Sequence, residues 1–345
     1  MRRLASRSAY RGLVIGLLAL LALSCVLALG FGSAQIPSSQ VGDILLSKLG
    51  LTNAGAWPSS QEAIVWQLRA PRVLLGALVG AGLAMIGAAL QAVTRNPLAD
   101  PHLLGVSSGA ALGAVLVIMY LGHFAGTLSL PLAAFAGALG SMLLVLDLAR
   151  PRQRQDEARP QGERLLLAGV AVSFVLMALV NLLLYVGDPH AASSVMFWML
   201  GGLGQASWNL LPLPALGVLA ALLVLLVLAR PLDALLCGEH TAASLGVDTR
   251  RLRWQVFVCC SLLTGVLVSL AGAIGFVGLM LPHLARWLVG SEHRRLIPVC
   301  ALLGALFLVW VDVAARSLIA PQDLPIGIAT AALGGLFFIG MLRRR

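Results

Sequence analysis

Long apolar runs alternate with short polar segments along almost the entire chain. A helix needs about 20 apolar residues to cross a hydrocarbon core of about 30 Å. Strand-like alternation is absent, and only helices and closed barrels span a bilayer. The pattern therefore predicts an all-α membrane protein, a polytopic bundle of about ten transmembrane helices that forms one domain over residues 1–345. The predicted spans lie near 13–31, 73–93, 104–121, 130–149, 165–186, 209–229, 254–271, 274–289, 296–317 and 325–342.

Composition agrees with this interpretation. Of the 345 residues, 59% are hydrophobic and 11% are charged, whereas a soluble domain carries roughly 25% charged residues. The mean hydropathy is +0.93. The five cysteines (Cys25, Cys237, Cys259, Cys260 and Cys300) form no CxxC pair. We therefore expect buried thiols rather than a disulfide framework or a metal site.

The N-terminal segment resembles a secretory signal, because arginines precede an apolar run. That run, from Leu13 to Leu29, is longer than the usual signal core of about 7–15 residues. A lipoprotein signal would use Cys25, but Ala22 stands where leucine is normally found. We expect an uncleaved first helix.

The net charge of +10 indicates an orientation rather than a nucleic-acid partner. With both termini in the cytoplasm, most of the 24 Lys and Arg residues fall in cytoplasmic segments, as the positive-inside bias requires. Lys48, Arg69, Arg72 and Arg316 fall on the outer side. The three arginines either extend to lipid headgroups or form a docking surface for an acidic partner, and the residues alone leave both alternatives open.

Residues 94–110, TRNPLADPHLLGVSSGA, interrupt two apolar runs. Asn96 and Pro97 end a helix and Pro101 prevents its immediate resumption, so the segment predicts a tight cytoplasmic loop. Glycines follow and precede it at a spacing of four. Because small residues four apart let helix backbones approach closely, we expect helix packing at Gly76, Gly80, Gly105, Gly109 and Gly113.

Five segments in one order carry a more specific signal. They are RAPRVLLGALVGAGLAMIGAALQAVTRNPLADPHLLGVSSGAALGAV, ERLLLAGVAVSF, MFWMLGGLG, AGAIGFVGLMLPHLARWLVGSEHR and DLPIGIATAALGGLFFI. Together they closely resemble the transmembrane permeases of ABC importers for ferric siderophores, haem and cobalamin, over roughly residues 13–342. The resemblance implies a multi-pass protein of the bacterial inner membrane. It also implies three protein partners: a second copy of the chain, a cytoplasmic ATPase dimer and a periplasmic substrate-binding protein.

The same resemblance suggests roles for individual residues. Asn96 and Leu98 match a cytoplasmic gate element, and Gln161 and Gly162 match a second one more loosely. Arg69, Arg72 and Arg316 coincide with positions that receive carboxylates of the binding protein, which favours docking. Residues 231–253 match the coupling helices that contact the ATPase, although an ordinary surface loop is the alternative. Within them the predicted coupling residues are Glu239, Ala243, Leu245, Gly246 and Asp248, with Gly238 and Gly246 as breaks and Asp248 as a helix cap.

The resemblance also places the segment after the fifth span beside the substrate path, with Met196, Trp198 and Met199 as its lining. His190 lies in the same region, where a solvated loop histidine is favoured over a haem ligand. Neither it nor His102, His283 and His293 has a partner at ligand spacing, so no metal site or cofactor is predicted.

The sequence argues against two other classes of function. An ion-coupled secondary transporter usually holds ionisable residues at mid-membrane, whereas the only acidic residues within the predicted spans, Asp147 and Asp312, lie near span ends. A membrane enzyme would need a catalytic motif such as HExxH, which does not occur; residues 105–109, GVSSG, have the GxSxG spacing but open an apolar run that is predicted to be a membrane span. Since GxxxxGK[ST] is also missing, the chain is not expected to hydrolyse ATP. For the substrate, a ferric siderophore is the first expectation, haem the second and cobalamin the third.

Overall fold

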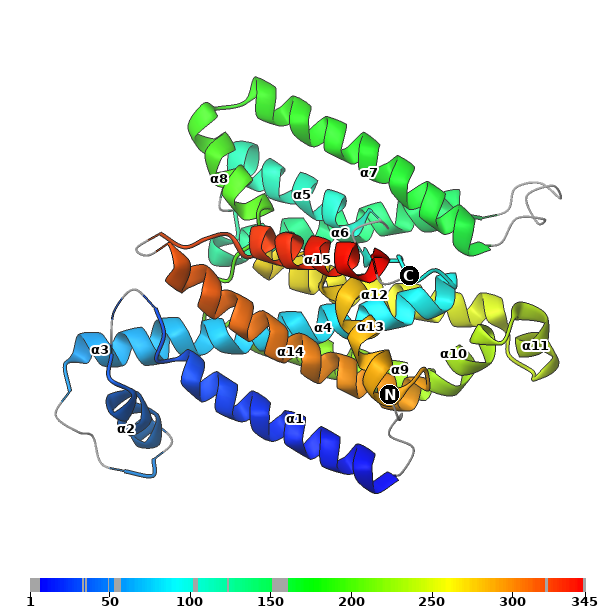
Figure 1. The fold of residues 1–345 in the computed structure, drawn as a ribbon. Helices are drawn as coiled ribbons and strands as arrows, with labels where there is room; N and C mark the ends of the chain where they lie inside the picture. Colours follow the sequence, from blue (N-terminus) through cyan, green and yellow to red (C-terminus); the bar gives the residue numbers. More distant parts are fainter. Residues whose placement is uncertain are drawn as a thin grey trace.

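All regular structure in this chain is helical wherever the computed structural model describes it. The described residues are 7–32, 34, 36–48, 50–52, 57–101, 105–122, 124–150, 161–319 and 322–343. Most of the long helices run roughly along one direction and form an elongated bundle (Figure 1). The all-α prediction is confirmed.

The helices differ widely in length. The long ones are α1 (Arg7–Ala28), α4 (Ala70–Thr94), α6 (Ser129–Leu148), α7 (Gln161–Val186), α9 (Pro212–Val227), α12 (Thr249–Ala271), α14 (His293–Leu318) and α15 (Ile326–Leu342). The shorter ones are α2 (Ser38–Lys48), α3 (Ser59–Ala63), α5 (Val106–Leu116), α8 (Pro189–Met199), α10 (Ala229–Leu236), α11 (Glu239–Ser244) and α13 (Val277–Val289). Two π-helical turns, η1 (Ile64–Arg69) and η3 (Val117–Leu121), adjoin α4 and α5, and a 3-10 turn, η4 (Gly126–Leu128), precedes α6.

Each predicted span overlaps a described helix, but not every one of these helices is long enough to cross a membrane by itself. Among the described residues, six helical stretches are long and apolar enough to cross a membrane. A seventh is added if α9 and α10, which are bent by 56° at the break between them, form one span. The apolar stretches Val106–Leu121, Val277–Val289 and Ile326–Leu342 are shorter. The count of ten spans stays a prediction.

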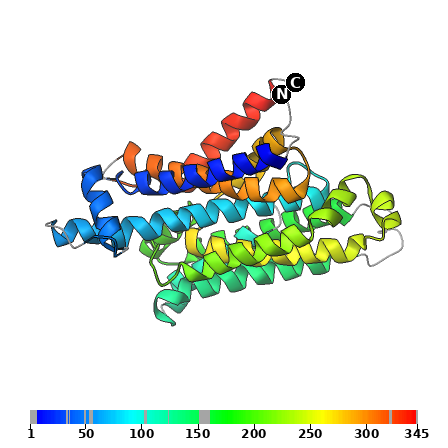
Figure 2. The same cartoon turned by 90° about the horizontal axis from the view of Figure 1, so that it is seen from below.

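Helix α4 is the centre of the bundle. In the most apolar window of the stretch Ser59–Thr94, 78% of the residues are buried, against 11% for α1 and 22% for α7. α4 packs against α14, α13, α12 and α9, whereas α1 and α7 lie at opposite edges (Figure 1). Figure 2 shows α1 lying along α14. The outward side chains of α1 and α7 are apolar, so these faces suit contact with lipid or with another subunit.

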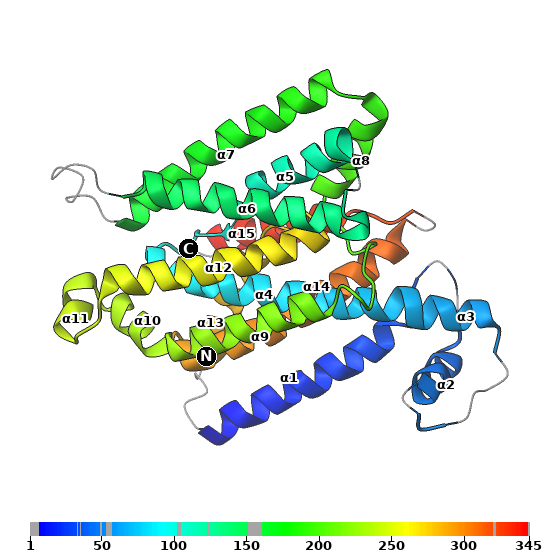
Figure 3. The same cartoon turned by 180° about the vertical axis from the view of Figure 1, so that it is seen from behind.

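The two ends of the bundle carry different elements. Helices α10 and α11 form one end, called the α11 end below, and α2, α3 and α8 lie at the other, the α2 end (Figure 3). The first turn of α1 and the last turn of α15 both point toward the α11 end (Figures 1 and 3). The two ends of the described chain therefore lie on the same side of the bundle.

Glycines make the closest helix crossings. A Cβ atom added to Gly80 would lie 2.1 Å from the carbonyl oxygen of Gly304, so α4 and α14 meet backbone to backbone. Gly109 and Gly113 of α5 lie in the same way against Gly137 and Ala133 of α6. Of the other glycines predicted to pack, Gly76 contacts only the Leu203 side chain, and Gly105 has a φ of 79° and precedes α5. A further crossing was not predicted from the sequence: a Cβ on Gly87 would lie 2.0 Å from the carbonyl oxygen of Gly278, where α4 meets α13.

Helix α6 offers a matched test of these crossings. Gly137→Ala places a Cβ 2.1 Å from the carbonyl oxygen of Gly109, which forces α5 and α6 apart, whereas a Cβ on Gly140 meets nothing within 4 Å. We expect G137A to lower the stability by about 1–3 kcal/mol, the usual cost of overpacking, and G140A to leave it nearly unchanged. Thermal unfolding of the full chain in detergent measures both. Equal midpoints for the two variants would contradict the backbone contact.

Candidate functional site

Residues 95–100 follow α4 at the α11 end and are called the gate turn after the role that the sequence predicts for Asn96 and Leu98. Arg95 adopts a left-handed conformation with a φ of 52°, and its N–H donates to the carbonyl of Ala92 (3.2 Å). The N–H of Asn96 donates to the carbonyl of Gln91 (3.2 Å), which completes a helix C-cap. The Oδ1 atom of Asn96 then accepts the N–H of Leu98 (2.9 Å). Asn96 thus fixes the turn, and Leu98, which is 54% exposed, projects from it.

A buried polar contact ties the gate turn to α13. Gln91 lies one turn before the gate turn, and its Nε2 donates to the carbonyl of Gly278 (3.1 Å). Its Oε1 accepts from Nη1 of Arg286 (2.7 Å). Because α4 and α13 also meet backbone to backbone at Gly278, a movement of the gate turn would disturb both helices.

The coupling segment, residues 231–253, folds as the end of α10, the short helix α11 and the start of α12. Gly238 and Gly246 have φ values of 114° and 79°, so both breaks lie where the sequence predicts them. Asp248 caps α12 as expected, since its Oδ1 accepts the N–H of Arg251 (2.9 Å). Ala243, Leu245 and Gly246 are exposed, with Leu245 at 67%. The segment therefore presents a small, partly apolar surface.

One arginine joins the coupling segment to the helix that carries the gate turn. Arg253 is buried, and its guanidinium forms an ion pair with the Glu239 carboxylate at the start of α11. Its Nε also donates to the carbonyl of Val93 in the last turn of α4 (3.4 Å). Glu239, Arg253 and Val93 thus form a continuous hydrogen-bonded link from α11 to the base of the gate turn.

A second contact anchors α10. Oδ1 of Asp233 accepts the backbone N–H of His293 (3.0 Å) and lies 2.6 Å from its Nδ1, so α10 is held against the start of α14. A polar cavity of about 290 Å³ lies between the gate turn, α10 and α13. Its lining includes Gln91, Arg95, Arg286 and His293. The gate turn and the coupling segment therefore border the same cavity.

Two other sequence predictions concern this end. Gln161 and Gly162, the looser gate element, form the first turn of α7, and their side chains lie outside the described structure, as does His102. α7 packs against α5 and α6. The gate role of Gln161 and Gly162 stays a prediction.

The α2 end gathers the three arginines that the sequence analysis associates with docking. Arg69 and Arg316 are buried, at 6% and 4% exposure. Nη1 of Arg69 donates to the carbonyl of Leu29 (2.8 Å) and Nη2 of Arg316 donates to that of Ala28 (2.8 Å). Both side chains therefore hold the end of α1 against η1 and α14 instead of reaching outward.

Two carboxylates complete this cluster. Nε of Arg72 donates to Oδ1 of Asp312 (2.9 Å), and its Nη1 donates to Oδ2 of Asp323 (2.6 Å). Asp312 is fully buried, and its Oδ2 lies 3.4 Å from Nε of Arg316. All three arginines are therefore engaged within the chain in this conformation. A docking role would require either that the partner contacts the partly exposed Asp323 and Arg72, or that the arginines rearrange.

The predicted path residues lie on α8, which begins at a cap where Oδ1 of Asp188 accepts the N–H of His190 (2.7 Å). Met196 is 60% exposed, while Trp198 and Met199 are half-buried and pack against neighbouring apolar side chains. Phe174 and Tyr185 of α7 are likewise large apolar side chains that the described parts of this chain leave exposed. His190 is also exposed. Within the described ranges, no group of three or more His, Cys, Asp or Glu side chains is arranged to hold a metal ion.

Several contacts could not be found from the sequence. Arg253 lies in the run RRLR, which the charge analysis counted only as a topological signal. Arg286 and Gln91 are far apart in the chain and in different predicted spans. A polar residue inside an otherwise apolar run, such as Gln91, was the one available signal, because such residues normally face protein rather than lipid.

Comparison with known proteins gives consistent results. Residues 20–344 match the model of the FecCD transport family. The vitamin B12 import system permease protein of Vibrio cholerae is 39% identical over 303 residues, which cover 87% of this chain and 89% of that protein. The hemin transport system permease protein of Yersinia pestis is 36% identical, covering 92% of this chain and 96% of that one. A solved inward-facing structure of a metal-chelate type ABC transporter superposes with a TM-score of 0.82 at 32% identity, covering 97% of this chain and 100% of that chain.

Proposed function

This chain belongs to the FecCD transport family of ABC importer permeases, and we propose that it passes a bulky metal chelate across a bacterial inner membrane. The energy comes from a separate ATPase, because the sequence contains no GxxxxGK[ST] motif. The α11 end faces the cytoplasm, as the distribution of basic residues favours. A periplasmic binding protein delivers the substrate at the α2 end.

The observation that carries this proposal is the link from Glu239 through Arg253 to Val93. It runs from a short helix with an exposed surface to the base of a turn that ends the central helix. A rigid, hydrogen-bonded connection of this kind can transmit a push from a partner subunit to a gate. A channel or a secondary transporter has no need for such a connection to an exposed cytoplasmic helix.

We further propose that the chain works as a homodimer. Exposed apolar side chains on α7 and α8, among them Phe174, Tyr185 and Met196, suit contact with a second copy. A path between two copies would then have Met196 at its border, with Trp198 and Met199 behind it. Few charges line this region, so a bulky ligand would bind weakly enough to leave.

For the substrate, we place a metal tetrapyrrole, cobalamin or haem, ahead of a ferric siderophore. The relatives support this order, because one is named for vitamin B12 and another for hemin. The three substrate classes share a metal ion enclosed by a large organic ligand, and the apolar border of the path suits all of them. The siderophore was the first expectation from the sequence because it is the broadest substrate class within the resembled family.

Reconstituted transport tests the function. The permease is placed in liposomes with its ATPase, and the binding protein is supplied with cobalamin, haem or a ferric siderophore. We expect ATP-dependent uptake of one of these that an ionophore leaves unchanged, and no uptake when the ATPase is omitted. Uptake that collapses with an ion gradient and ignores ATP would identify a secondary transporter and refute the proposal.

A further inference from the structure

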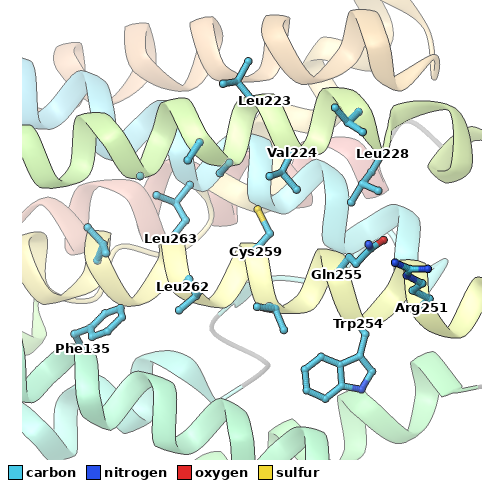
Figure 4. A pocket seen from close by; sticks show the side chains of 16 residues that line it. Phe135, Leu223, Val224, Leu228, Arg251, Trp254, Gln255, Cys259, Leu262 and Leu263 are labelled. Carbon is cyan, nitrogen blue, oxygen red and sulfur yellow. The ribbon is translucent and has the colours of Figure 1, made fainter.

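A long apolar groove lies away from the gate turn, between α9 and α12. Its volume is about 820 Å³, within the range of pockets that hold organic ligands. Small residues of α9, including Gly217, Ala220 and Ala221, form one wall, and α12 forms the other. Phe135 of α6 closes one end (Figure 4). The side chains at its edge, such as Val224 and Leu262, are exposed, so the groove is open to the surroundings of the bundle.

Polar groups occur at only one end of this groove. Arg251, Trp254 and Gln255 gather near the bend between α9 and α10, at the opposite end from Phe135 (Figure 4). Arg251 is exposed, and its guanidinium has no carboxylate partner among the described residues. The nearby Asp248 instead accepts the backbone N–H of Arg251 as the cap of α12. An unpaired positive charge and an indole therefore mark the α11 end of the groove.

The dimensions of the groove match one leaflet of a bilayer. Its lining on α12 extends from Arg251 to Val266, which corresponds to about 22 Å at the helical rise of about 1.5 Å per residue. One leaflet including its headgroup region is half of about 40–45 Å, or about 20–22 Å. Arginine and tryptophan are the side chains that typically lie at the headgroup level of a membrane.

We propose that this groove binds a phospholipid with an anionic headgroup, whose phosphate is held by Arg251 and whose acyl chain lies between α9 and α12. The charge of the unpaired guanidinium selects the headgroup, and Trp254 and Gln255 border it. The apolar walls formed by the two helices hold the chain. The site is separate from the gate turn and from the coupling link, and it does not depend on the substrate.

Native mass spectrometry of the full chain in detergent tests the site. Phosphatidylglycerol and phosphatidylcholine with identical acyl chains are titrated separately. We expect the wild-type protein to retain phosphatidylglycerol roughly fivefold more strongly, which is the contribution of one basic residue at a membrane surface. Arg251→Gln should abolish this preference. Ala220→Trp, at an exposed position in the groove wall, should weaken the retention of both lipids.

Arg250→Gln is the matched control, because Arg250 is also exposed and carries the same charge but does not line this groove. It should keep the preference for phosphatidylglycerol. Equal effects of R250Q and R251Q, or equal retention of both lipids by the wild type, would refute the site. Inorganic phosphate is not expected to displace phosphatidylglycerol, and displacement would mean that the groove does not hold the acyl chain.

Discussion

Replacing Asp312 by Asn is expected to destabilise the protein more than any other single change at the α2 end. Asp312 is fully buried between Arg72 and Arg316. Removing its charge takes away the carboxylate that pairs with Arg316, which is only 4% exposed, and leaves Arg72 paired with Asp323 alone. Breaking a buried ion pair by removing one partner typically costs about 3–5 kcal/mol. Thermal unfolding of the purified protein in detergent should show a clear fall in midpoint.

Asp323→Asn is the control for this prediction. Asp323 contacts the same Arg72, but its side chain is 51% exposed, and exposed ion pairs contribute about 0–1 kcal/mol. We expect D323N to unfold close to the wild type. If D312N and D323N both unfolded at the wild-type temperature, the cluster would have no structural role. Docking would then be the remaining role for Arg69, Arg72 and Arg316.

The helical class and the positions of the spans were predictable because a bilayer leaves the backbone almost no alternative. An apolar run such as 73–93 must form hydrogen bonds within itself, and α4 covers it. Local signals were also sufficient at helix ends. Asn96 with Pro97 ended α4, and Asp248 capped α12. Helix α2 was not predicted, because its sequence, SSQVGDILLSK, is too short and too polar for a span.

Tertiary partners could not be predicted from one sequence. GxxxG spacing indicated close packing by Gly80 and Gly109 but not that they would meet Gly304 and Gly137. Charge counting treated Arg253 as a topological residue, although it is buried and bonded to two other elements. In the same way, Arg69 and Arg316 were expected to face outward, and their burial depends on backbone carbonyls at the end of α1 that no local pattern reveals.

Replacing Glu239 by Ala is expected to reduce transport without releasing the ATPase. The change removes the ion pair between α11 and Arg253 but leaves the exposed surface of α11 and Leu245 intact. Coupling free energies between sites are typically about 1–3 kcal/mol, so uptake per ATP hydrolysed should fall by roughly tenfold. In Glu239→Gln, whose side chain can still accept a hydrogen bond, uptake per ATP hydrolysed should fall by less. Both quantities are measured in liposomes that contain the complete importer.

Leu245→Asp separates this effect from loss of the partner. Leu245 is 67% exposed and contributes nothing to the link through Arg253, so L245D should weaken association with the ATPase in a pull-down assay. Glu239→Ala should leave that association unchanged. The link would be refuted if E239A coupled hydrolysis to uptake as the wild type does, since the contact between α11 and the gate turn would then be structural only. Loss of ATPase binding in E239A would also refute the link. It would mean that the ion pair between Glu239 and Arg253 shapes α11 as the surface that binds the ATPase, rather than transmitting movement to the gate turn.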